Sequence, residues 1–321
     1  MMRLVVLGNA TVDSVRHLER LPAVGETVLG QAPMRCAGGK GFNQAVVAAR
    51  AGACVELIAP IGTDEDARLL RRAAEEEPLE RAGWILADAP TDTSSIWVDA
   101  AGRNMIASSA RCAHGMGAER AAAEATACLR AGDWLLMQGN LPRAATEAAA
   151  VAARRLGARV AINAAPAAFA FDDLLSSCDL LVVNEVEAAA LSGTDDAIAG
   201  ARVLACRLDV VLTLGESGAI ALASGAEVIL PAPRVAVVDS AGAGDVLVGT
   251  LVAGLSRGAP MGSALELAVA AASLSVTRPG TSTSFPSSAE IEALRARQEG
   301  ASGPRASGPL ARSDRLAQGR G

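Results

Sequence analysis

Short apolar runs alternate with longer alanine-rich segments along most of the chain. The runs RLVVLG (3–8) and VELIAPIG (55–62) predict buried strands, and the segments 41–52 and 64–77 predict helices. The alternation continues through GDWLLMQGN (132–140), a helix near 143–156, ARVAINAAP (158–166), CDLLVVNEVEAAALSG (178–193), DVVLTLGESGAIAL (209–222) and a long helix after Gly244. Strands that alternate with helices predict an α/β fold with a mostly parallel central sheet, covered by helices on both faces.

Two segments break this pattern and predict a small β lid outside the central sheet. Residues 12–34 are rich in proline and glycine and contain short alternating pieces such as ETVLG (26–30). Residues 93–110 read as a hairpin with a turn at Asp99–Gly102. We expect both segments to form strands that cover one end of the sheet.

The periodic pattern ends near residue 297. From residue 298 onward the chain is dominated by Gly, Ser, Pro and Arg. Such a composition predicts a disordered tail over 298–321, with a basic binding arm as the alternative. Residues 1–297 then form one domain.

Composition narrows the class of protein. The 321 residues are 51% hydrophobic but only 2% aromatic, which predicts a large aliphatic core. A formal charge of −6 argues against nucleic acid as the main partner. The first residues, MMRLVVLG, are too short an apolar run for a signal peptide or a membrane span.

The cysteines and histidines exclude several kinds of site. The six cysteines lie far apart without a CxxC pair, which argues against structural zinc and a disulfide framework and favours the reducing cytoplasm. The two histidines, His17 and His114, have no neighbouring ligands, and no GxSxG nucleophile elbow is present. We therefore expect any general base to be Asp, Glu or Lys.

The stretch DSAGAGDVLVGTLVAGL (239–255) is the first candidate for chemistry. Gly242, Ala243 and Gly244 leave the backbone bare where an apolar helix begins. The first amides of a helix lack partners within it and favour negative charge. Asp245 follows at once and could accept a proton from an attacking hydroxyl. The alternative is an ordinary glycine-rich helix start with an acidic first turn.

The stretch CAGGKGFNQAVVAARAG (36–52) is the second candidate. Its glycines allow a polar ligand to approach the backbone, while Lys40 and Asn43 offer donors. The spacing is neither that of a P-loop nor that of a dinucleotide-binding GxGxxG turn. The alternative is a flexible loop that enters a helix.

Together these stretches resemble the ribokinase family of PfkB-type sugar kinases. GGKGFNQA (38–45) is similar to the first signature of the family, and DSAGAGDVLVG (239–249) is similar to the second. The resemblance extends from VVLGNATVD near the start to VTRPGTSTSFP (276–286) and covers roughly residues 3–295. It implies a three-layer α/β/α domain with a β lid that often mediates dimerisation, and an ATP-dependent kinase that phosphorylates a hydroxymethyl group of a small sugar.

The resemblance also implies a role for each matching residue. Asp245 matches the catalytic base, and the amides of Gly242, Ala243 and Gly244 match the anion hole. Sugar contacts fall on Thr11, Asp13, Gly39, Lys40, Asn43 and Asn140. ATP contacts fall on Asn184, Thr213, Gly215 and Gly218, with Glu187 acting indirectly on Mg²⁺. A monovalent-cation site, which we expect to hold K⁺, falls on Asp239, Ala241, Ser275, Arg278, Gly280 and Ser284.

Alternatives remain open at several positions. Asn184 and Glu187 could simply cap a helix, Asp13 could be a turn residue, and Arg278 could be a surface charge. Thr11 and Asn140 depart from the ribokinase pattern, in which Asn140 is replaced by a glutamate. Ribose is the first acceptor implied, and a nucleoside or a phosphorylated sugar is the alternative. A third possibility is a ligand-binding relative without catalysis.

Overall fold

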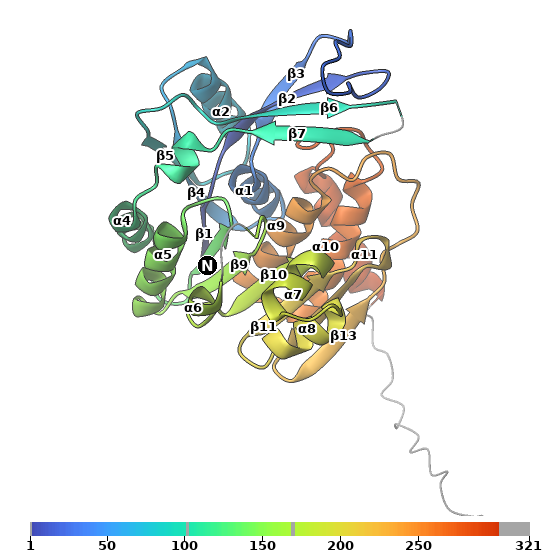
Figure 1. Cartoon of the computed structure of the whole chain (residues 1–321). Coiled ribbons are helices and arrows are strands. Elements are labelled where there is room, and N and C mark those ends of the chain that lie inside the picture. The colour runs from blue at the N-terminus through green and yellow to red at the C-terminus, as the bar shows by residue number, and fades with distance from the viewer. Residues whose placement is uncertain (1, 101–102, 168–170, 302–321) are drawn as a thin grey trace, which may run out of the picture.

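The computed structural model describes residues 2–100, 103–167 and 171–301, and a nine-stranded sheet forms its centre (Figure 1). The strand order is β13-β12-β11-β10-β9-β8-β1-β4-β5. The strands are β1 (Arg3–Leu7), β4 (Cys54–Ile61), β5 (Arg81–Leu86), β8 (Trp134–Gln138), β9 (Arg159–Asn163), β10 (Leu180–Asn184), β11 (Asp209–Thr213), β12 (Ala219–Ala223) and β13 (Ala226–Leu230). All neighbours pair in parallel except β11–β12 and β12–β13, which are antiparallel. The predicted α/β class with a mostly parallel sheet is confirmed.

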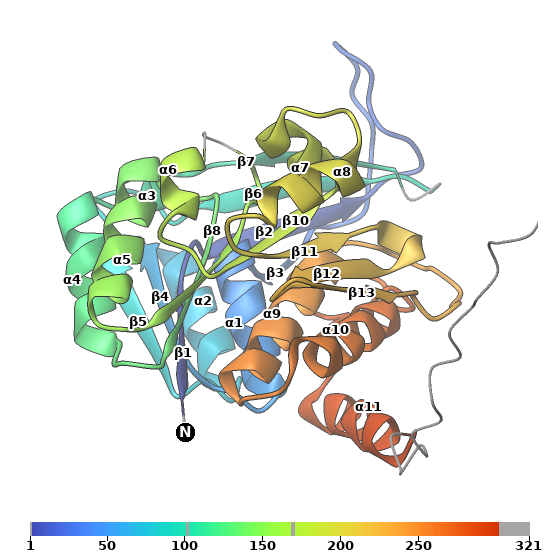
Figure 2. The ribbon, with the colours of Figure 1, turned by 90° about the horizontal axis from the view of Figure 1, so that it is seen from below.

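Helices cover both faces of this sheet (Figure 2). One face carries α1 (Lys40–Arg50), α2 (Glu65–Glu75), α9 (Ala243–Ser256), α10 (Met261–Ser275) and α11 (Ser288–Ala301). The other carries α3 (Arg111–His114), α4 (Ala118–Cys128), α5 (Arg143–Arg155), α6 (Asp172–Leu175), α7 (Glu185–Ser192) and α8 (Ala197–Leu204). A short 3₁₀ turn, η1 (Gly215–Ser217), links β11 to β12.

Each helical layer packs an aliphatic core against its face of the sheet. Leu70 of α2 and Leu251 of α9 are fully buried on one side, and Ala149 of α5 and Ala201 of α8 are fully buried on the other. Strand residues supply both cores because successive side chains of a strand point to opposite faces. Strands buried on both faces read as continuous apolar runs, which is why the sequence pattern located them.

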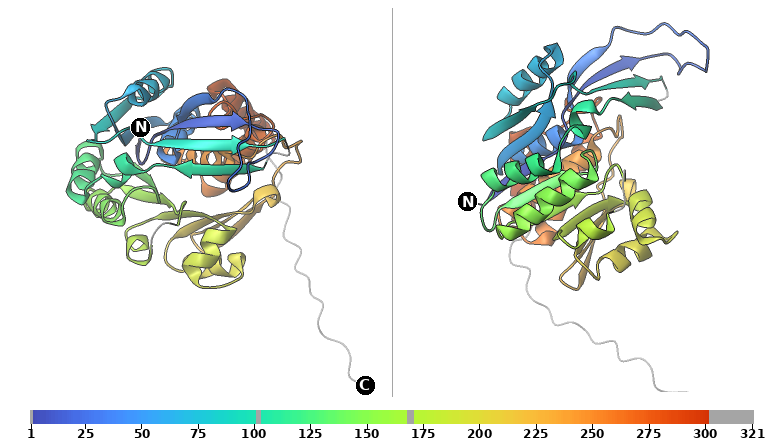
Figure 3. Two further views of the ribbon diagram at one scale, coloured as in Figure 1. Left: turned by 45° about the horizontal axis from the view of Figure 1, so that its top comes forward. Right: turned by 60° about the vertical axis from the view of Figure 1, so that its left-hand side comes forward.

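A second, four-stranded sheet forms the lid over the carboxyl ends of the central strands (Figure 3). Its order is β3-β2-β6-β7, made of β2 (Thr11–His17), β3 (Met34–Gly38), β6 (Thr93–Val98) and β7 (Asn104–Ser108). The predicted piece ETVLG (26–30) is not a strand, since only an isolated bridge joins Gly30 to Leu18. Leu29 is exposed, so packing against other apolar side chains does not stabilise a strand in this segment. The predicted turn at Asp99–Gly102 lies partly outside the described residues.

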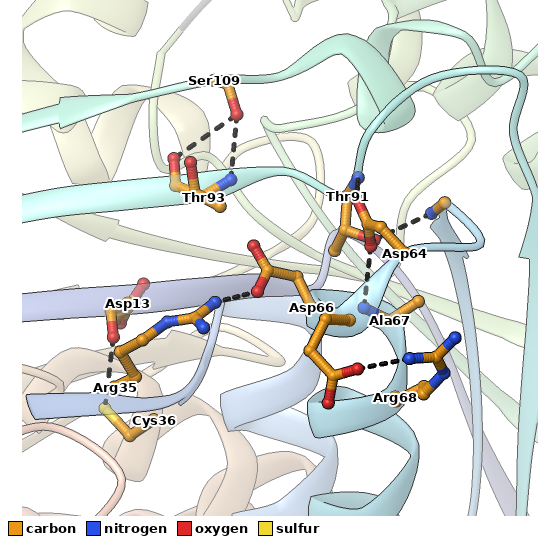
Figure 4. Close-up of polar contacts among 12 residues, drawn as sticks. Asp13, Arg35, Cys36, Asp64, Asp66, Ala67, Arg68, Thr91, Thr93 and Ser109 are labelled. Carbon is orange, nitrogen blue, oxygen red and sulfur yellow. Dashed lines mark hydrogen bonds and ion pairs between the residues drawn. The ribbon is translucent and has the colours of Figure 1, made fainter.

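Polar contacts attach the lid to α2 (Figure 4). Arg35 of β3 forms an ion pair with Asp66 of α2. Asp64 caps α2 by accepting from the Ala67 amide at 3.0 Å, and it also accepts from the Thr91 amide at 2.8 Å. The start of α2 therefore holds two parts of the lid: strand β3, through Arg35, and the segment that enters β6, through Thr91.

The C-terminal helix corrects one predicted boundary. α11 runs to Ala301, past residue 297, where the sequence pattern ended the domain. The Gln298 side chain donates to Glu266 Oε2 at 2.8 Å and to the Ser263 carbonyl oxygen at 2.9 Å, both on α10. These contacts continue the helix where composition alone predicts its end. The rest of the predicted tail, 302–321, lies outside the described residues.

None of the helices in the described ranges combines the length and apolar character that a membrane crossing requires.

Candidate active site

A cavity of about 930 Å³, here called the acceptor cavity, lies between the lid and the carboxyl ends of the central strands. Lid residues such as Ser94 form one wall, and α1 and the start of α9 form the floor. The structure brings these predicted site residues together around it: Thr11, Asp13, Gly39, Lys40, Asn43, Asn140, Asp239, Ala241, Gly242, Asp245 and Gly280. All of the predicted sugar contacts therefore face one space.

Asp245 lies buried in the first turn of α9, at the bottom of the acceptor cavity. Asn43 Nδ2 donates to its Oδ2 at 2.9 Å, and Gln44 Nε2 donates to its Oδ1 at 2.9 Å. Lys40 Nζ lies 3.9 Å from the same Oδ1. Two amide donors and a lysine side chain thus surround this buried carboxylate.

The start of α9 is open to an anion. Gly242 caps the helix with φ 78°, and a Cβ there would lie 2.6 Å from the Phe285 ring, so only glycine fits. The Ala243 amide donates to the Ser240 carbonyl oxygen at 3.3 Å. Within the described residues, the amides of Gly242, Gly244 and Asp245 have no hydrogen-bond acceptor. These amides are free to bind negative charge.

Asp13 is a second buried carboxylate in the acceptor cavity, held on lid strand β2. Burial raises its pKa, and hydrogen bonds from Thr11 and Ser94 offset part of that rise. Thr11 Oγ1 donates to Asp13 Oδ1 at 2.9 Å. A Cβ on Gly38 of the neighbouring strand would lie 2.2 Å from Asp13 Oδ2. Asp13 is therefore a strand residue with a fixed side chain rather than a turn residue.

Asn184 and Glu187 form the capping box of α7. Glu187 Oε2 accepts from the Asn184 amide at 2.9 Å, and Asn184 Oδ1 accepts from the Glu187 amide at 2.9 Å. Burial raises the pKa of Glu187, and the nearby Lys40 lowers it in part. The structure thus shows the helix cap, and it places Lys40 near both Glu187 and Asp245.

A second cavity, of about 910 Å³, lies on the other side of the α9 start and is here called the donor cavity. Gly215 and Gly218 lie on its rim, while Leu247 of α9 and Val269 of α10 line its apolar floor. A Cβ on Gly218, which has φ 98°, would lie 2.0 Å from the Leu230 carbonyl oxygen. Thr213 ends β11 just before this rim but does not line the donor cavity.

The predicted cation residues lie on two loops that meet beside α9. Asp239 joins the loops, since its Oδ1 accepts from the Ala241 amide at 2.9 Å and its Oδ2 accepts from the Gly280 amide at 3.0 Å. Ser275 and Ser284 are buried, and each hydroxyl donates to a backbone carbonyl oxygen at 2.8 Å. The Arg278 side chain instead pairs with Glu290 of α11.

Three residues of the site escaped the sequence analysis. Gln44, Gln138 and Asn163 are buried amide side chains linked to one another and to Asp245. The available signal was that Gln138 and Asn163 each end a buried apolar strand with a polar side chain. Buried polar side chains almost always have hydrogen-bond partners, so a polar residue at the end of a buried apolar strand indicates a polar site there.

The two cavities meet at the α9 start. Val237 and Ser240 line both of them, and Gly242 and Ala243 line one each. A hydroxyl in the acceptor cavity and an anionic group in the donor cavity would therefore approach each other at the open amides, next to Asp245. This geometry suits transfer of an anionic group to an alcohol, because the amides could stabilise the moving charge and the carboxylate could take the proton.

Comparison with known proteins gives a consistent result. The model of the pfkB family of carbohydrate kinases matches residues 1–288. The ribokinase of Haemophilus influenzae is 32% identical over 295 residues, covering 89% of this chain and 96% of that protein. The deoxyribokinase of Salmonella typhimurium is 30% identical over 300 residues, covering 89% and 96%. The crystal structure of the Thermotoga maritima ribokinase aligns with a TM-score of 0.83 at 29% identity, covering 92% of this chain and 99% of that one.

The predicted resemblance, the three-layer fold and the kinase class are thereby confirmed. The family model spans most of the chain, and the relatives align over nearly their whole length. This chain belongs to the pfkB family of carbohydrate kinases, in which it is a ribokinase-like sugar kinase.

Proposed function

We propose that this kinase transfers the γ-phosphate of ATP to a hydroxymethyl group of a small sugar, with ribose as the first candidate. The observation that carries the proposal is the meeting of the acceptor and donor cavities at the α9 start, beside buried Asp245. Phosphoryl transfer depends on positioning and charge stabilisation, and both are available there.

In this proposal the chain's own residues divide the work. Asp245 accepts the proton of the attacking hydroxyl, and the open amides at Gly242 and Gly244 hold the transferred phosphoryl oxygens. The Ala243 amide joins them by leaving its long bond to Ser240. Asp13 and Asn43 hold the remaining hydroxyls, and the lid excludes water that would compete as acceptor.

Mg²⁺ fits near Glu187. The cap of α7 uses only Glu187 Oε2, and in the described part of the chain Oε1 has no hydrogen bond. A carboxylate oxygen is the kind of group that Mg²⁺ prefers, often through water. Glu187 and Asn184 line neither cavity, but Glu187 lies near Lys40, so these two residues would hold the ion through water, and the ion would neutralise phosphate charge.

K⁺ fits the loops joined by Asp239. Their donors are oxygens: the Asp239 carboxylate, backbone carbonyl groups, and the hydroxyls of Ser275 and Ser284, which keep lone pairs free. Because the Arg278 guanidinium is paired with Glu290, Arg278 would contribute its carbonyl oxygen. A cation there would add positive charge beside the open amides of α9.

The acceptor is set by Thr11 and Asn140, where the chain departs from the ribokinase pattern. Asn140 Oδ1 is buried and has no partner among the described residues, so it can accept from a sugar hydroxyl. The relatives include both ribokinase and deoxyribokinase. Buried polar groups discriminate strongly between acceptors that do and do not satisfy them.

An acceptor screen with Mg²⁺-ATP and K⁺ tests the proposal. Ribose, 2-deoxyribose, nucleosides and sugar phosphates would be compared by kcat/KM, with ADP release as the readout. We expect a free pentose to be preferred. Preference for a nucleoside or a sugar phosphate would reassign the acceptor, and tight ATP binding without turnover of any acceptor would favour a binding protein.

We also propose a homodimer formed through the lid. Exposed apolar side chains lie on the lid strands, at Met34 and Met105, and on the loop between β2 and β3, at Val24 and Leu29. Pairing of two lids would cover them. Light scattering should give twice the monomer mass, and Met105→Glu should reduce it to the monomer. A monomeric wild type at assay concentration would contradict the dimer.

A cytoplasmic location completes the proposal. All six cysteines are free thiols. Free thiols persist in a reducing compartment. Fractionation of cells that express the chain with its native ends would test this.

A further inference from the structure

Three buried amide side chains form a row beneath Asp245. Gln138 Nε2, at the end of β8, donates to Gln44 Oε1 on α1 at 2.8 Å. Gln44 Nε2 then donates both to Asn163 Oδ1 at 3.1 Å and to Asp245 Oδ1 at 2.9 Å. None of the three amides lines the acceptor cavity or the donor cavity, so none faces the space that a substrate would occupy.

The direction of this row is fixed by a backbone group. Asn163 Nδ2 donates to the Val182 carbonyl oxygen of β10 at 3.1 Å, and a carbonyl oxygen can only accept. Asn163 must therefore point Oδ1 toward Gln44, and Gln44 must donate to it with Nε2. Its Oε1 is then left for Gln138. The sheet thus dictates that Gln44 presents a donor, never an acceptor, to Asp245.

Backbone packing holds both ends of the Gln44–Asp245 bond. One turn beyond Asp245, α9 passes α1 so closely that a Cβ on Gly249 would lie 2.7 Å from the Gln44 carbonyl oxygen. A larger residue there would push the helices apart. The distance between the Gln44 amide and the Asp245 carboxylate is therefore set by the fold.

We propose that Gln44, oriented by Gln138 and Asn163, is a positioning residue that aims the Asp245 carboxylate at the acceptor hydroxyl. It holds Oδ1 from beneath, while Asn43 holds Oδ2. Rotation of the carboxylate would break one of these bonds. The proton-accepting lone pair then points into the acceptor cavity without reorganisation during the reaction.

The other groups around Asp245 do not provide this constraint. Lys40 is 3.9 Å away on a partly exposed side chain, so it supplies charge rather than direction. Asp13 also lines the acceptor cavity, but among the described residues it forms no hydrogen bond with Asp245. Gln44 supplies the bond to Oδ1 from the buried side.

The inference rests on the proposed role of Asp245 and is tested first with Gln44→Leu. A hydrogen bond to a charged group corresponds to about 10- to 100-fold in rate, so we expect kcat to fall by about that factor. The KM values for sugar and ATP should stay within about twofold, because Gln44 lines neither cavity. The control is Thr250→Val, which alters a fully buried α9 side chain outside the row and should keep the wild-type kcat.

A double-mutant cycle separates positioning from a general structural effect. If Gln44 acts through Asp245, adding Gln44→Leu to Asp245→Asn should reduce the residual single-turnover rate by less than about twofold. Loss of the full factor again in the double variant would overturn the inference. So would a wild-type kcat for folded Gln44→Leu when Asp245→Asn is inactive. An active Asp245→Asn would instead remove the proposed base itself, and the inference with it.

Gln138→Leu gives a second reading if Gln44→Leu does not fold. It removes only the bond that orients Gln44 from behind, while the donor to Asp245 remains. We expect a smaller loss of kcat, about three- to tenfold, again with unchanged KM values. A folded Gln138→Leu enzyme with wild-type kcat would contradict the proposed row.

Discussion

The acceptor and donor cavities are of nearly equal volume but of opposite construction. The acceptor cavity is lined by buried carboxylates: Asp245 accepts hydrogen bonds from side chains of α1, and Asp13 accepts one from Thr11 of its own strand. The floor of the donor cavity is apolar, with Leu247 and Val269, and its rim is the glycine backbone of η1. One cavity is therefore defined by fixed hydrogen-bond partners and the other by shape.

This difference predicts in which cavity substitutions change the choice of acceptor and in which cavity substitutions are tolerated. A buried polar group left without its partner costs far more than a small change in an apolar wall. Substitutions in the acceptor cavity should therefore alter rate and acceptor choice sharply. Substitutions around the donor cavity should mainly change the KM for ATP, and by smaller factors.

Among the substitutions in the acceptor cavity, Asp245→Asn should reduce kcat most. The variant keeps the shape of the side chain but cannot take the hydroxyl proton, so we expect kcat to fall by about 10²- to 10⁴-fold. Calorimetry should show ATP binding unchanged, because Asp245 does not line the donor cavity. Retained turnover would remove Asp245 from the role of base.

Asn140→Ala should show the next largest effect. It removes an acceptor atom that is buried and unpartnered in the described structure, so kcat/KM for the preferred sugar should fall by about 10- to 100-fold. The KM for ATP serves as the internal control and should not move. An equal loss with every sugar and with ATP would indicate a folding defect rather than lost recognition.

Replacement of K⁺ by tetramethylammonium should slow the reaction by about tenfold. The bulky ion cannot approach the oxygens around Asp239. The open amides of α9 would then lack the positive charge that K⁺ places beside them. Initial rates at constant ionic strength measure this. Asp239→Asn should reduce the dependence on K⁺. Equal rates of the wild type in both salts would contradict the cation site.

The fold could be read from the sequence because burial on two faces leaves a plain pattern. Residues 4–7 of β1 are all apolar and fully buried, and the helices between strands follow as covering layers. The α9 start was also readable, since Gly242, Gly244 and Asp245 are adjacent in the chain. Local chemistry that needs neighbouring residues survives in a sequence.

The row beneath Asp245 was not readable for the opposite reason. Its bonds join residues separated by 94, 119 and 201 positions, and only the crossing of α1 with the strand ends brings them together. The lid strand β3 was misplaced because ETVLG has the right alternation but no partner strand. Pairing is a property of the folded chain, which no single segment encodes.

Arg234→Ala should produce the smallest effect and sharpen the comparison from the donor side. Arg234 is an exposed cation on the rim of the donor cavity, where it can approach a phosphate chain through water. Because exposed charges interact weakly, we expect the KM for ATP to rise only about two- to fivefold, with the sugar KM unchanged. The control is Arg297→Ala on α11, an exposed arginine that lines neither cavity, and this variant should leave both KM values unchanged.

The increase in the KM for ATP caused by Arg234→Ala should shrink at high salt, since screening already weakens the attraction between Arg234 and the phosphates. A fall in kcat with the KM for ATP unmoved would show that Arg234 acts on the transfer step, and the division between a chemically fixed acceptor cavity and a shape-defined donor cavity would then be wrong.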